Sequence, residues 1–318
     1  MIPCILPVWN PAITSGLRKT DWLFAPWLFV SRIPFLKSRS QSVVLTRNSS
    51  PITVLKVGEL FHWTSRKLSE KVEAALKTVL LIDAVNWSDA YAPDHPLRNV
   101  GQWFKRHFTD VSDIDVQVAR PDDGPLHFNP ENFDGLILSG SPRDAWDRQD
   151  PVNDQLIEVA ALCRDKNLPF LGVCYGHQIL ARALGGVVER HPDGLELGTV
   201  AVRLTDAGRK CPVFDELPSS FDVMEGHVDY VTGLPDGCHH LISGDHTPMQ
   251  GIGYNGFMFG VQFHPEMNPE ILRYLWTARL ETWRERVTFD LDERLKSFRP
   301  ADSSAKVLLN FLKFVSSF

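Results

Sequence analysis

The chain has 318 residues and a mass of 35.9 kDa, a length that predicts one large domain or two smaller ones. Hydrophobic residues make up 43% and charged residues 23%, values typical of globular proteins, which argues against a chain that is disordered throughout. The formal net charge is −6, but residues 1–57 carry +6 and the remainder −12. An acidic body offers nucleic acid no electrostatic surface, so we expect no nucleic-acid partner.

Neither the cysteines nor the apolar runs indicate a secreted or membrane protein. The longest apolar run, residues 22–30, is interrupted by Pro26 and is too short to span a bilayer. The cysteines are odd in number and form no CxxC pair, which favours free thiols in a reducing compartment and predicts a cytoplasmic protein. They are Cys4, Cys163, Cys174, Cys211 and Cys238.

Residues 1–76 differ in composition from the rest of the chain, since they are rich in Pro, Ser and Arg and carry almost no acids before Glu59. This composition resembles an organelle targeting segment, although the prolines interrupt any long amphipathic helix. A true extension and a reading frame started too far upstream both remain open. The one helical pattern covers residues 65–77. We therefore expect an N-terminal extension outside the core over 1–76 and one domain over 77–318.

From Thr78 onward, short apolar runs alternate with amphipathic segments. This alternation predicts an α/β fold with an open, mostly parallel sheet covered by helices on both faces. After Gly185 the pattern changes to added mixed strands and two closing helices. The expected strands are 78–84, 115–119, 134–140, 169–174, 187–191, 198–204, 220–226, 239–243, 251–254 and 257–263, and the expected helices are 97–108, 152–166, 176–184, 269–287 and 304–315.

The segment around Cys174 predicts a nucleophile elbow, because an apolar strand ends in Gly172-Val173-Cys174-Tyr175-Gly176 and a helix follows at once. So tight a turn requires small residues two positions before and after the nucleophile. The N-terminus of the helix then faces the sulfur and favours its thiolate form. Taken alone, the pattern also fits a cysteine that packs as a small core residue.

A candidate base follows a second apolar strand, in Gln262-Phe263-His264-Pro265-Glu266. His264 is expected at the carboxyl end of that strand, where sites in parallel sheets lie. Glu266 is two residues on and projects to the same side in an extended chain, so it can orient the imidazole.

A third segment, Gly140-Ser141-Pro142, ends the strand expected beside the elbow strand. A glycine-containing turn there can direct backbone N–H groups at a developing oxyanion, with the amides of Ser141 and Tyr175 as the natural pair. An ordinary turn at the end of a strand has the same sequence pattern, so this segment is only supporting evidence for a catalytic site.

The motifs LILSGSP, GVCYGHQ and QFHPE together resemble the class I glutamine amidotransferases, a triad family whose glutaminase domain also occurs in GMP synthase. The resemblance covers roughly residues 78–318 and implies a flavodoxin-like α/β fold. It implies that Cys174 is the nucleophile, His264 the base and Glu266 its orienting carboxylate. The substrate-binding positions that it implies are Gly140, Gln178, His227 and Asp229.

Two positions depart from the family pattern. Many relatives have Gly where this chain has Ser141, and GMP synthases usually have Met where it has His177. His177 resembles the stand-alone members, which include the γ-glutamyl peptidases.

The resemblance implies cysteine-dependent hydrolysis of a γ-glutamyl amide, such as glutamine to glutamate and ammonia, through a γ-glutamyl thioester by a stand-alone enzyme. A γ-glutamyl peptidase and a non-catalytic scaffold of the same fold remain alternatives. The sequence contains no pyrophosphatase loop or Walker A motif, so we expect any synthetase or acceptor subunit to be a separate polypeptide. We expect no cofactor and no metal, because Cys238, His239, His240 and His246 lack a ligand spacing.

Overall fold

The computed structural model describes residues 42–47, 50–56, 76–88, 91–108 and 111–318, in two units that divide between Ala74 and Ala75 and are described separately. In the first unit, β1 (Ser42–Arg47) and β2 (Ser50–Lys56) pair antiparallel. Neither strand is among the predicted elements, although both are rich in β-branched residues. The helix predicted over 65–77 lies outside the described residues except for Leu76 and Lys77, and Lys77 begins a strand.

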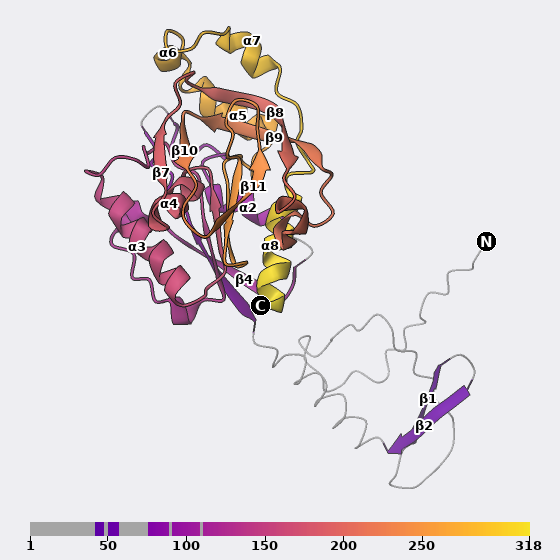
Figure 1. Ribbon diagram of the computed structural model, residues 1–318. Coiled ribbons are helices and arrows are strands. Elements are labelled where there is room, and N and C mark those ends of the chain that lie inside the picture. The colour runs from indigo at the N-terminus through magenta and orange to yellow at the C-terminus, as the bar shows by residue number, and fades with distance from the viewer. Residues whose placement is uncertain (1–41, 48–49, 57–75, 89–90, 109–110) are drawn as a thin grey trace, which may run out of the picture. The chain divides into compact units, whose positions relative to one another are not determined.

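The second unit is built on a nine-stranded sheet with the order β4-β3-β5-β6-β13-β12-β11-β8-β9 (Figure 1). The first five strands are parallel, and the last four continue the sheet antiparallel, which confirms the predicted parallel sheet with added mixed strands. The parallel strands are β3 (Lys77–Ile82), β4 (Ile114–Ala119), β5 (Gly135–Leu138), β6 (Phe170–Val173) and β13 (Met258–Val261). The antiparallel strands are β8 (Glu196–Leu204), β9 (Ser220–His227), β11 (Cys238–Ser243) and β12 (Gly251–Tyr254).

Helices cover both faces of the sheet, as predicted, because successive side chains of each strand point to opposite sides. Val79 and Leu81 of β3 pack in one apolar cluster with α2, α5, α7 and α8, whereas Leu80 and Ile82 pack in a second cluster with α3 and α4. The helices are α2 (Val100–Lys105), α3 (Pro151–Asp165), α4 (Tyr175–Ala183), α5 (Pro269–Thr277), α6 (Leu280–Trp283), α7 (Leu291–Lys296) and α8 (Lys306–Ser317).

The prediction of one helix over 269–287 is wrong, because the structure has two separate helices there, α5 and α6, and α7 follows them. The helix ends where the phenol of Tyr91 donates to the carbonyl oxygen of Leu275 at 2.8 Å. In a continuing helix that carbonyl would also accept from the N–H of Arg279. That N–H instead bonds the carbonyl of Trp276 at 3.0 Å, and α5 ends.

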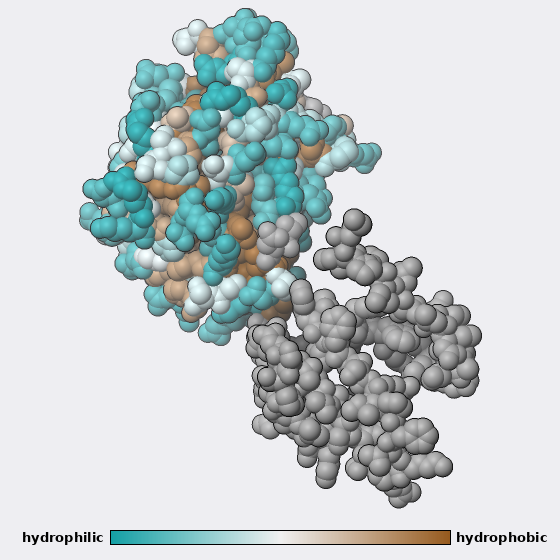
Figure 2. Space-filling view, turned by 90° about the vertical axis from the view of Figure 1, so that its right-hand side faces the viewer, coloured by the Kyte–Doolittle hydropathy of each residue, from teal (hydrophilic) through white to brown (hydrophobic). Residues whose placement is uncertain are grey.

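A separate two-stranded ribbon joins β7 (Val187–Arg190) to β10 (Asp229–Gly233), and β10 was not predicted. On the surface, hydrophilic side chains cover much of the face in Figure 2, with smaller hydrophobic areas between them. Within the described residues, no helix has the length and apolar character needed to cross a membrane.

Candidate active site

The turn from β6 into α4 holds Cys174 in a strained conformation. Its φ of 51° and ψ of −103° are uncommon for a residue other than glycine, and such strain costs on the order of 1–3 kcal/mol. The flanking chain is packed too closely for side chains. A Cβ on Gly172 would lie 2.3 Å from the carbonyl oxygen of Gly176, and a Cβ on Gly176 would lie 2.3 Å from that of Leu138. The predicted strand, tight turn and helix are therefore present, and their geometry requires both glycines.

His264 reaches the same edge of the sheet because β13 lies parallel to β6, with Val261 beside Val173. The backbone N–H of His264 donates to the carbonyl of Met224 at 2.9 Å, which fixes the chain beyond the strand. Its Nδ1 donates to Oε1 of Glu266 at 2.7 Å, and both side chains are buried. The imidazole and the carboxylate are thus hydrogen-bonded to each other at this edge of the sheet.

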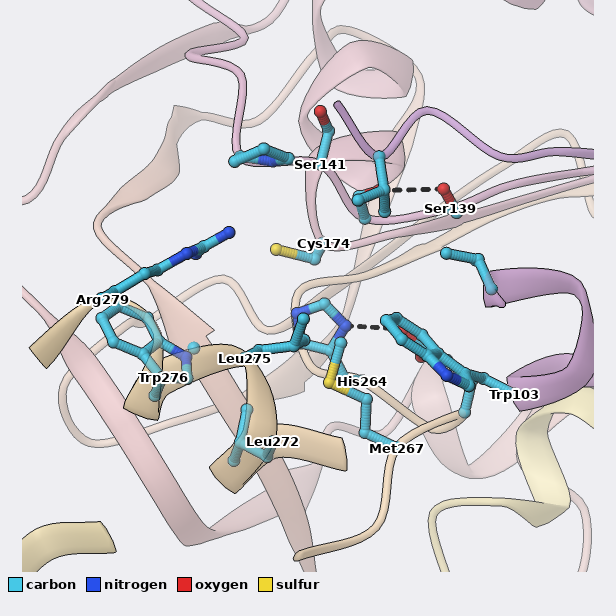
Figure 3. Close-up of a pocket in the computed structure, with 16 residues that line it drawn as sticks. Trp103, Ser139, Ser141, Cys174, His264, Met267, Leu272, Leu275, Trp276 and Arg279 are labelled. Carbon is cyan, nitrogen blue, oxygen red and sulfur yellow. Dashed lines mark hydrogen bonds and ion pairs between the residues drawn. The ribbon is translucent and has the colours of Figure 1, made fainter. Parts of the chain in front are cut away.

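The charges around His264 favour its protonated form. Burial by itself lowers the pKa of the imidazole, but the charges of Glu266 and Cys174 raise it well above its ordinary value. In Figure 3 the ring of His264 and the sulfur of Cys174 face one pocket. A proton is therefore held on the imidazole beside the sulfur.

The turn after β5 completes this edge. Ser139 anchors the turn, since its hydroxyl accepts from the amide of Ala84 at 2.9 Å and donates to the carbonyl of Gly140 at 2.8 Å. A Cβ on Gly140 would lie 2.7 Å from Cε1 of His264 and 3.6 Å from Cβ of Cys174. Gly140 thus lies against both side chains, and only glycine allows the turn to approach them so closely.

Two pockets meet at Cys174, each with an empty volume of about 500 Å³ that includes space open to solvent. We call the first the apolar pocket, after the apolar side chains that line it alone, which are Val85, Val100, Trp103, Met267, Leu272 and Leu275. Ser139, Gly140 and Glu266 also line this pocket and not the second. We call the second the charged pocket, after the charged side chains that line it alone, which are Arg143, Asp144, Arg190, His227 and Asp229. Gln178, Val228 and Trp283 also line this pocket and not the first. Both are lined by Ser141, Pro142, Cys174, Gly226, Trp276 and Arg279. His264 lines the apolar pocket and not the charged one.

Gln178 is tied to Cys174 through a residue that the sequence analysis missed. The side-chain nitrogen of Gln178 donates to the backbone oxygen of Asp229 at 2.7 Å and to Oε1 of Gln262 at 3.2 Å. The nitrogen of Gln262 in turn donates to the sulfur of Cys174 at 3.5 Å. Gln262 stands two residues before His264 in the QFHPE segment, a position that could have marked it by its alternation with the imidazole along an extended chain.

Asp229 lies at the charged pocket with Asp144 and Arg190. Its carboxylate is 3.6 Å from Nε of Arg190, and Arg190 also pairs with Asp144 at 3.2 Å. Burial and the charge of Asp144 raise the pKa of Asp229 to about 6, although Arg190 opposes the shift. The pocket thus presents both signs of charge close together.

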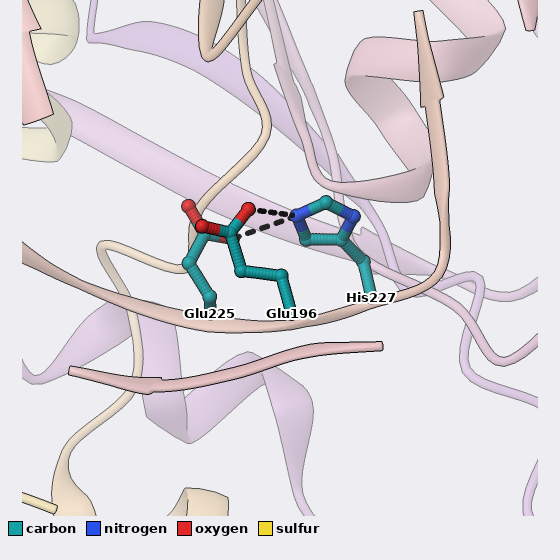
Figure 4. Close-up of side chains that lie close together, drawn as sticks. All are labelled: Glu196, Glu225 and His227. Carbon is teal, nitrogen blue, oxygen red and sulfur yellow. Dashed lines mark hydrogen bonds and ion pairs between the residues drawn. The ribbon is translucent and has the colours of Figure 1, made fainter. Parts of the chain in front are cut away.

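His227 lies between two buried glutamates, Glu196 on β8 and Glu225 on β9 (Figure 4). Its Nε2 is 3.2 Å from Oε2 of Glu196 and 3.3 Å from Oε2 of Glu225. Although burial opposes its charge, the hydrogen bond to Glu196 and the neighbouring carboxylate of Glu225 raise the pKa of His227 to about 10. Burial raises the pKa of Glu225 to about 7. The cluster therefore holds an imidazolium next to the charged pocket.

One possible ligand atom from each of these three side chains lies within 4.8 Å of the other two, close enough to surround a metal ion. An imidazolium has no free lone pair, so a metal would first have to displace its proton. Glu196 and Glu225 carry no sequence signal of a site, because a glutamate within a strand ordinarily faces solvent. Among the described residues, the histidines and cysteine near 238–246 do not form a ligand set of this kind.

Comparison with known proteins places the chain among relatives of one family. Residues 100–274 match the family model described as glutamine amidotransferase class-I. The chain is 34% identical over 157 residues to γ-glutamyl peptidase 5 of Arabidopsis thaliana, covering 48% of this chain and 59% of that protein. It is 32% identical over 192 residues to the glutamine-hydrolyzing GMP synthase of Thermosipho africanus, covering 57% of this chain and 35% of that protein.

A solved glutamine amidotransferase from Thermotoga maritima has the same fold, with a TM-score of 0.61 at 22% identity over 76% of this chain and 99% of that one. The chain spans less than two thirds of the length of the two curated relatives. The family model, however, matches more than half of the chain. The chain therefore belongs to the class I glutamine amidotransferase family.

Proposed function

We propose that the chain hydrolyses γ-glutamyl amides through a covalent thioester on Cys174. The observation that carries the proposal is the convergence of Cys174, His264 and Glu266 at one sheet edge, with the imidazole and carboxylate buried and 2.7 Å apart. The strained backbone of Cys174 supports it, since strain of this kind concentrates at working nucleophiles. A scaffold without catalysis has no use for either feature, so the enzyme is favoured over the scaffold.

In the proposed first step, the sulfur of Cys174 attacks the γ-carbonyl carbon and forms a C–S bond. The oxyanion is held by the backbone N–H groups of Ser141 and Tyr175, the second of which begins helix α4. His264 then gives its proton to the departing nitrogen as the C–N bond breaks, and the amine leaves neutral. Glu266 keeps the imidazole oriented throughout this transfer.

In the second step, His264 takes a proton from a water molecule that attacks the thioester carbon. The C–S bond breaks, glutamate leaves, and the proton on His264 balances the charge of the sulfur. The raised pKa of His264 supports this cycle, because the imidazolium is the form that must be present when the leaving group departs.

The charged pocket is the proposed site for the glutamyl head, which carries an ammonium and a carboxylate. Asp144 and Asp229 supply negative charge, and Arg143 and Arg190 supply positive charge. The amide nitrogen of Gln178 is already engaged, so its carbonyl oxygen is the group left to accept from the ammonium. The names of the relatives, a γ-glutamyl peptidase and a glutamine-hydrolyzing synthase, fit a γ-glutamyl substrate.

Two measurements on the purified full chain test the proposal. Release of glutamate from glutamine and from γ-glutamyl alkylamides is followed, and 6-diazo-5-oxo-L-norleucine, a reactive glutamine analogue, is mapped by mass spectrometry. We expect labelling at Cys174 and loss of activity in Cys174→Ala, with Cys238→Ala as a matched control that retains activity. Burial raises the pKa of Cys211 to about 12 and that of Cys238 to about 11, so both thiols should react slowly. Labelling of Cys163 or Cys211 ahead of Cys174 would overturn the assignment.

A further inference from the structure

The hydrolysis of glutamine gives the apolar side chains of the apolar pocket no contact to make. Ammonia leaves glutamine, and it makes no apolar contacts that such a pocket could use. The wall is nevertheless made of large hydrocarbon side chains from separate elements: Trp103 on α2, and Leu272, Leu275 and Trp276 on α5. Each of these four side chains is buried. A wall assembled from two helices on one side of the nucleophile calls for an apolar occupant.

The position of His264 decides which part of a substrate enters this pocket. A carbonyl carbon bonded to the sulfur of Cys174 carries the glutamyl chain on one side and the departing nitrogen on the other. The group that protonates the nitrogen must be within hydrogen-bond reach of it. Because His264 and Glu266 line the apolar pocket and not the charged one, the departing nitrogen faces the apolar pocket.

We propose that the apolar pocket is a leaving-group subsite, and that the preferred substrates are γ-glutamyl amides whose departing amine carries an apolar chain. This inference rests on the proposed function and adds the substrate class. In Figure 3 Trp103, Met267 and Leu272 gather on the His264 side of Cys174. A chain of propyl size or larger bonded to the nitrogen reaches these side chains, whereas the hydrogens of glutamine do not.

Arg279 lies where the two pockets join, and its guanidinium points toward Cys174 in Figure 3. Its Nε donates to the hydroxyl of Tyr91 at 2.8 Å, and the group stands 5.5 Å from the ring centre of Trp276. Arg279 has no ion pair with an acidic side chain of the described residues, unlike Arg143 and Arg190. A carboxylate on the departing group would pair with the guanidinium of Arg279. The departing group is therefore either a simple apolar amine or an amino acid with an apolar side chain.

The test compares substrates that differ in one group. L-γ-glutamyl-n-propylamide and L-γ-glutamylethanolamide have the same size, but the chain ends in a methyl group in the first and a hydroxyl in the second. We expect kcat/KM to be about tenfold or more higher for the propylamide than for the ethanolamide, because a hydrophobic pocket discriminates a methyl group from an isosteric hydroxyl by up to about 10²-fold. We also expect it to be higher for the propylamide than for glutamine, whose departing nitrogen carries no alkyl chain. A second pair, γ-glutamyl-n-butylamide and γ-glutamyl-L-norvaline, differs only by a carboxylate. A higher kcat/KM for γ-glutamyl-L-norvaline identifies the departing group as an amino acid held by Arg279. A higher kcat/KM for the butylamide identifies it as a simple amine.

Variants of Met267 show where the preference arises, since this residue lines the pocket and is only partly buried. Met267→Gln should reduce the ratio of kcat/KM for the propylamide to kcat/KM for the ethanolamide, and Met267→Leu should keep this ratio close to the wild-type value. The matched control is Met249→Gln, a partly buried methionine outside both pockets, which should keep the wild-type ratio. Equal kcat/KM values for glutamine, propylamide and ethanolamide would overturn the subsite and leave the proposed function standing. If no γ-glutamyl compound releases glutamate and Cys174 stays unlabelled, the proposed function fails, and the subsite fails with it.

Discussion

Replacing Glu266 by glutamine isolates the contribution of one negative charge to the proposed reaction. The carboxylate is 1% exposed, and its Oε1 is 2.7 Å from Nδ1 of His264. Glutamine has nearly the same shape, and its carbonyl oxygen can accept the same hydrogen bond. The substitution therefore removes the charge while the imidazole keeps its partner.

The expected loss follows from the strength of that bond. A hydrogen bond to a charged group contributes about 1.5–3 kcal/mol and a neutral one about 0.5–1.5 kcal/mol. The difference of about 1–2 kcal/mol corresponds to a loss in rate of roughly 5- to 30-fold. Removal of the imidazole itself in His264→Ala abolishes general acid and base catalysis, which contributes about 10²- to 10⁴-fold. We therefore expect Glu266→Gln to retain measurably more activity than His264→Ala.

The pH profile gives a second readout of the same substitution. The charge of Glu266 is the main influence that raises the pKa of His264, so Glu266→Gln lowers that pKa. Because the imidazolium protonates the leaving group, the wild type keeps activity to higher pH than the variant. Glutamate release measured across about pH 6–10 should show the alkaline fall in kcat shifted to lower pH.

Glu270→Gln is the matched control, since Glu270 is an exposed residue in the first turn of α5. It should behave as the wild type in rate and pH profile. Both site variants must be shown to be folded by circular dichroism, because Oε2 of Glu266 has no hydrogen-bond partner among the described residues and glutamine places a donor there. Equal losses in folded Glu266→Gln and His264→Ala would refute the reasoning and give Glu266 a part in proton transfer.

Three further outcomes are expected. Gly172→Ala should lower the free energy of unfolding by about 1–3 kcal/mol or more, because its Cβ would meet the carbonyl oxygen of Gly176 at 2.3 Å. The control is Gly101→Ala, whose Cβ would meet only side-chain atoms at 3.3 Å and beyond. Thermal melting compares the two variants, and an unchanged melting temperature in Gly172→Ala would contradict the prediction. Burial raises the pKa of Glu225 to about 7, so its contribution to stability is full below about pH 4.5 and is lost as pH rises through 7. Relative to the wild type, the melting temperature of Glu225→Gln should therefore rise between pH 4.5 and 8. A difference between the two melting temperatures that does not change with pH would exclude this role. A chain that starts at Lys77 should fold with little change in melting temperature, because β3 begins there and both described apolar clusters start at Val79 or later. A large drop in melting temperature would show that the preceding segment stabilises the domain.

The sequence alone determined the features that depend on local chain geometry. Short apolar runs that alternate with amphipathic segments predicted the parallel strands, since such runs fit strands covered on both faces. The spacing of Gly172 and Gly176 about Cys174 predicted a turn with room for no side chain, and the structure has it. Glu266 was predicted beside His264 on the assumption of an extended chain. The two side chains do pair, although residues 265 and 266 form a turn. Each of these inferences needed only neighbouring residues.

Long-range pairing decided the rest. Strand β10 forms by pairing with β7, about 40 residues earlier in the chain, and α5 ends where the phenol of Tyr91 donates to the carbonyl of Leu275. The glutamates around His227 are buried because β8 and β9 pair in the register that sets Glu196 opposite it. The division into an apolar and a charged pocket likewise depends on which elements the sheet order brings against Cys174. Contacts of this kind depend on strand order and register, which local propensity does not encode.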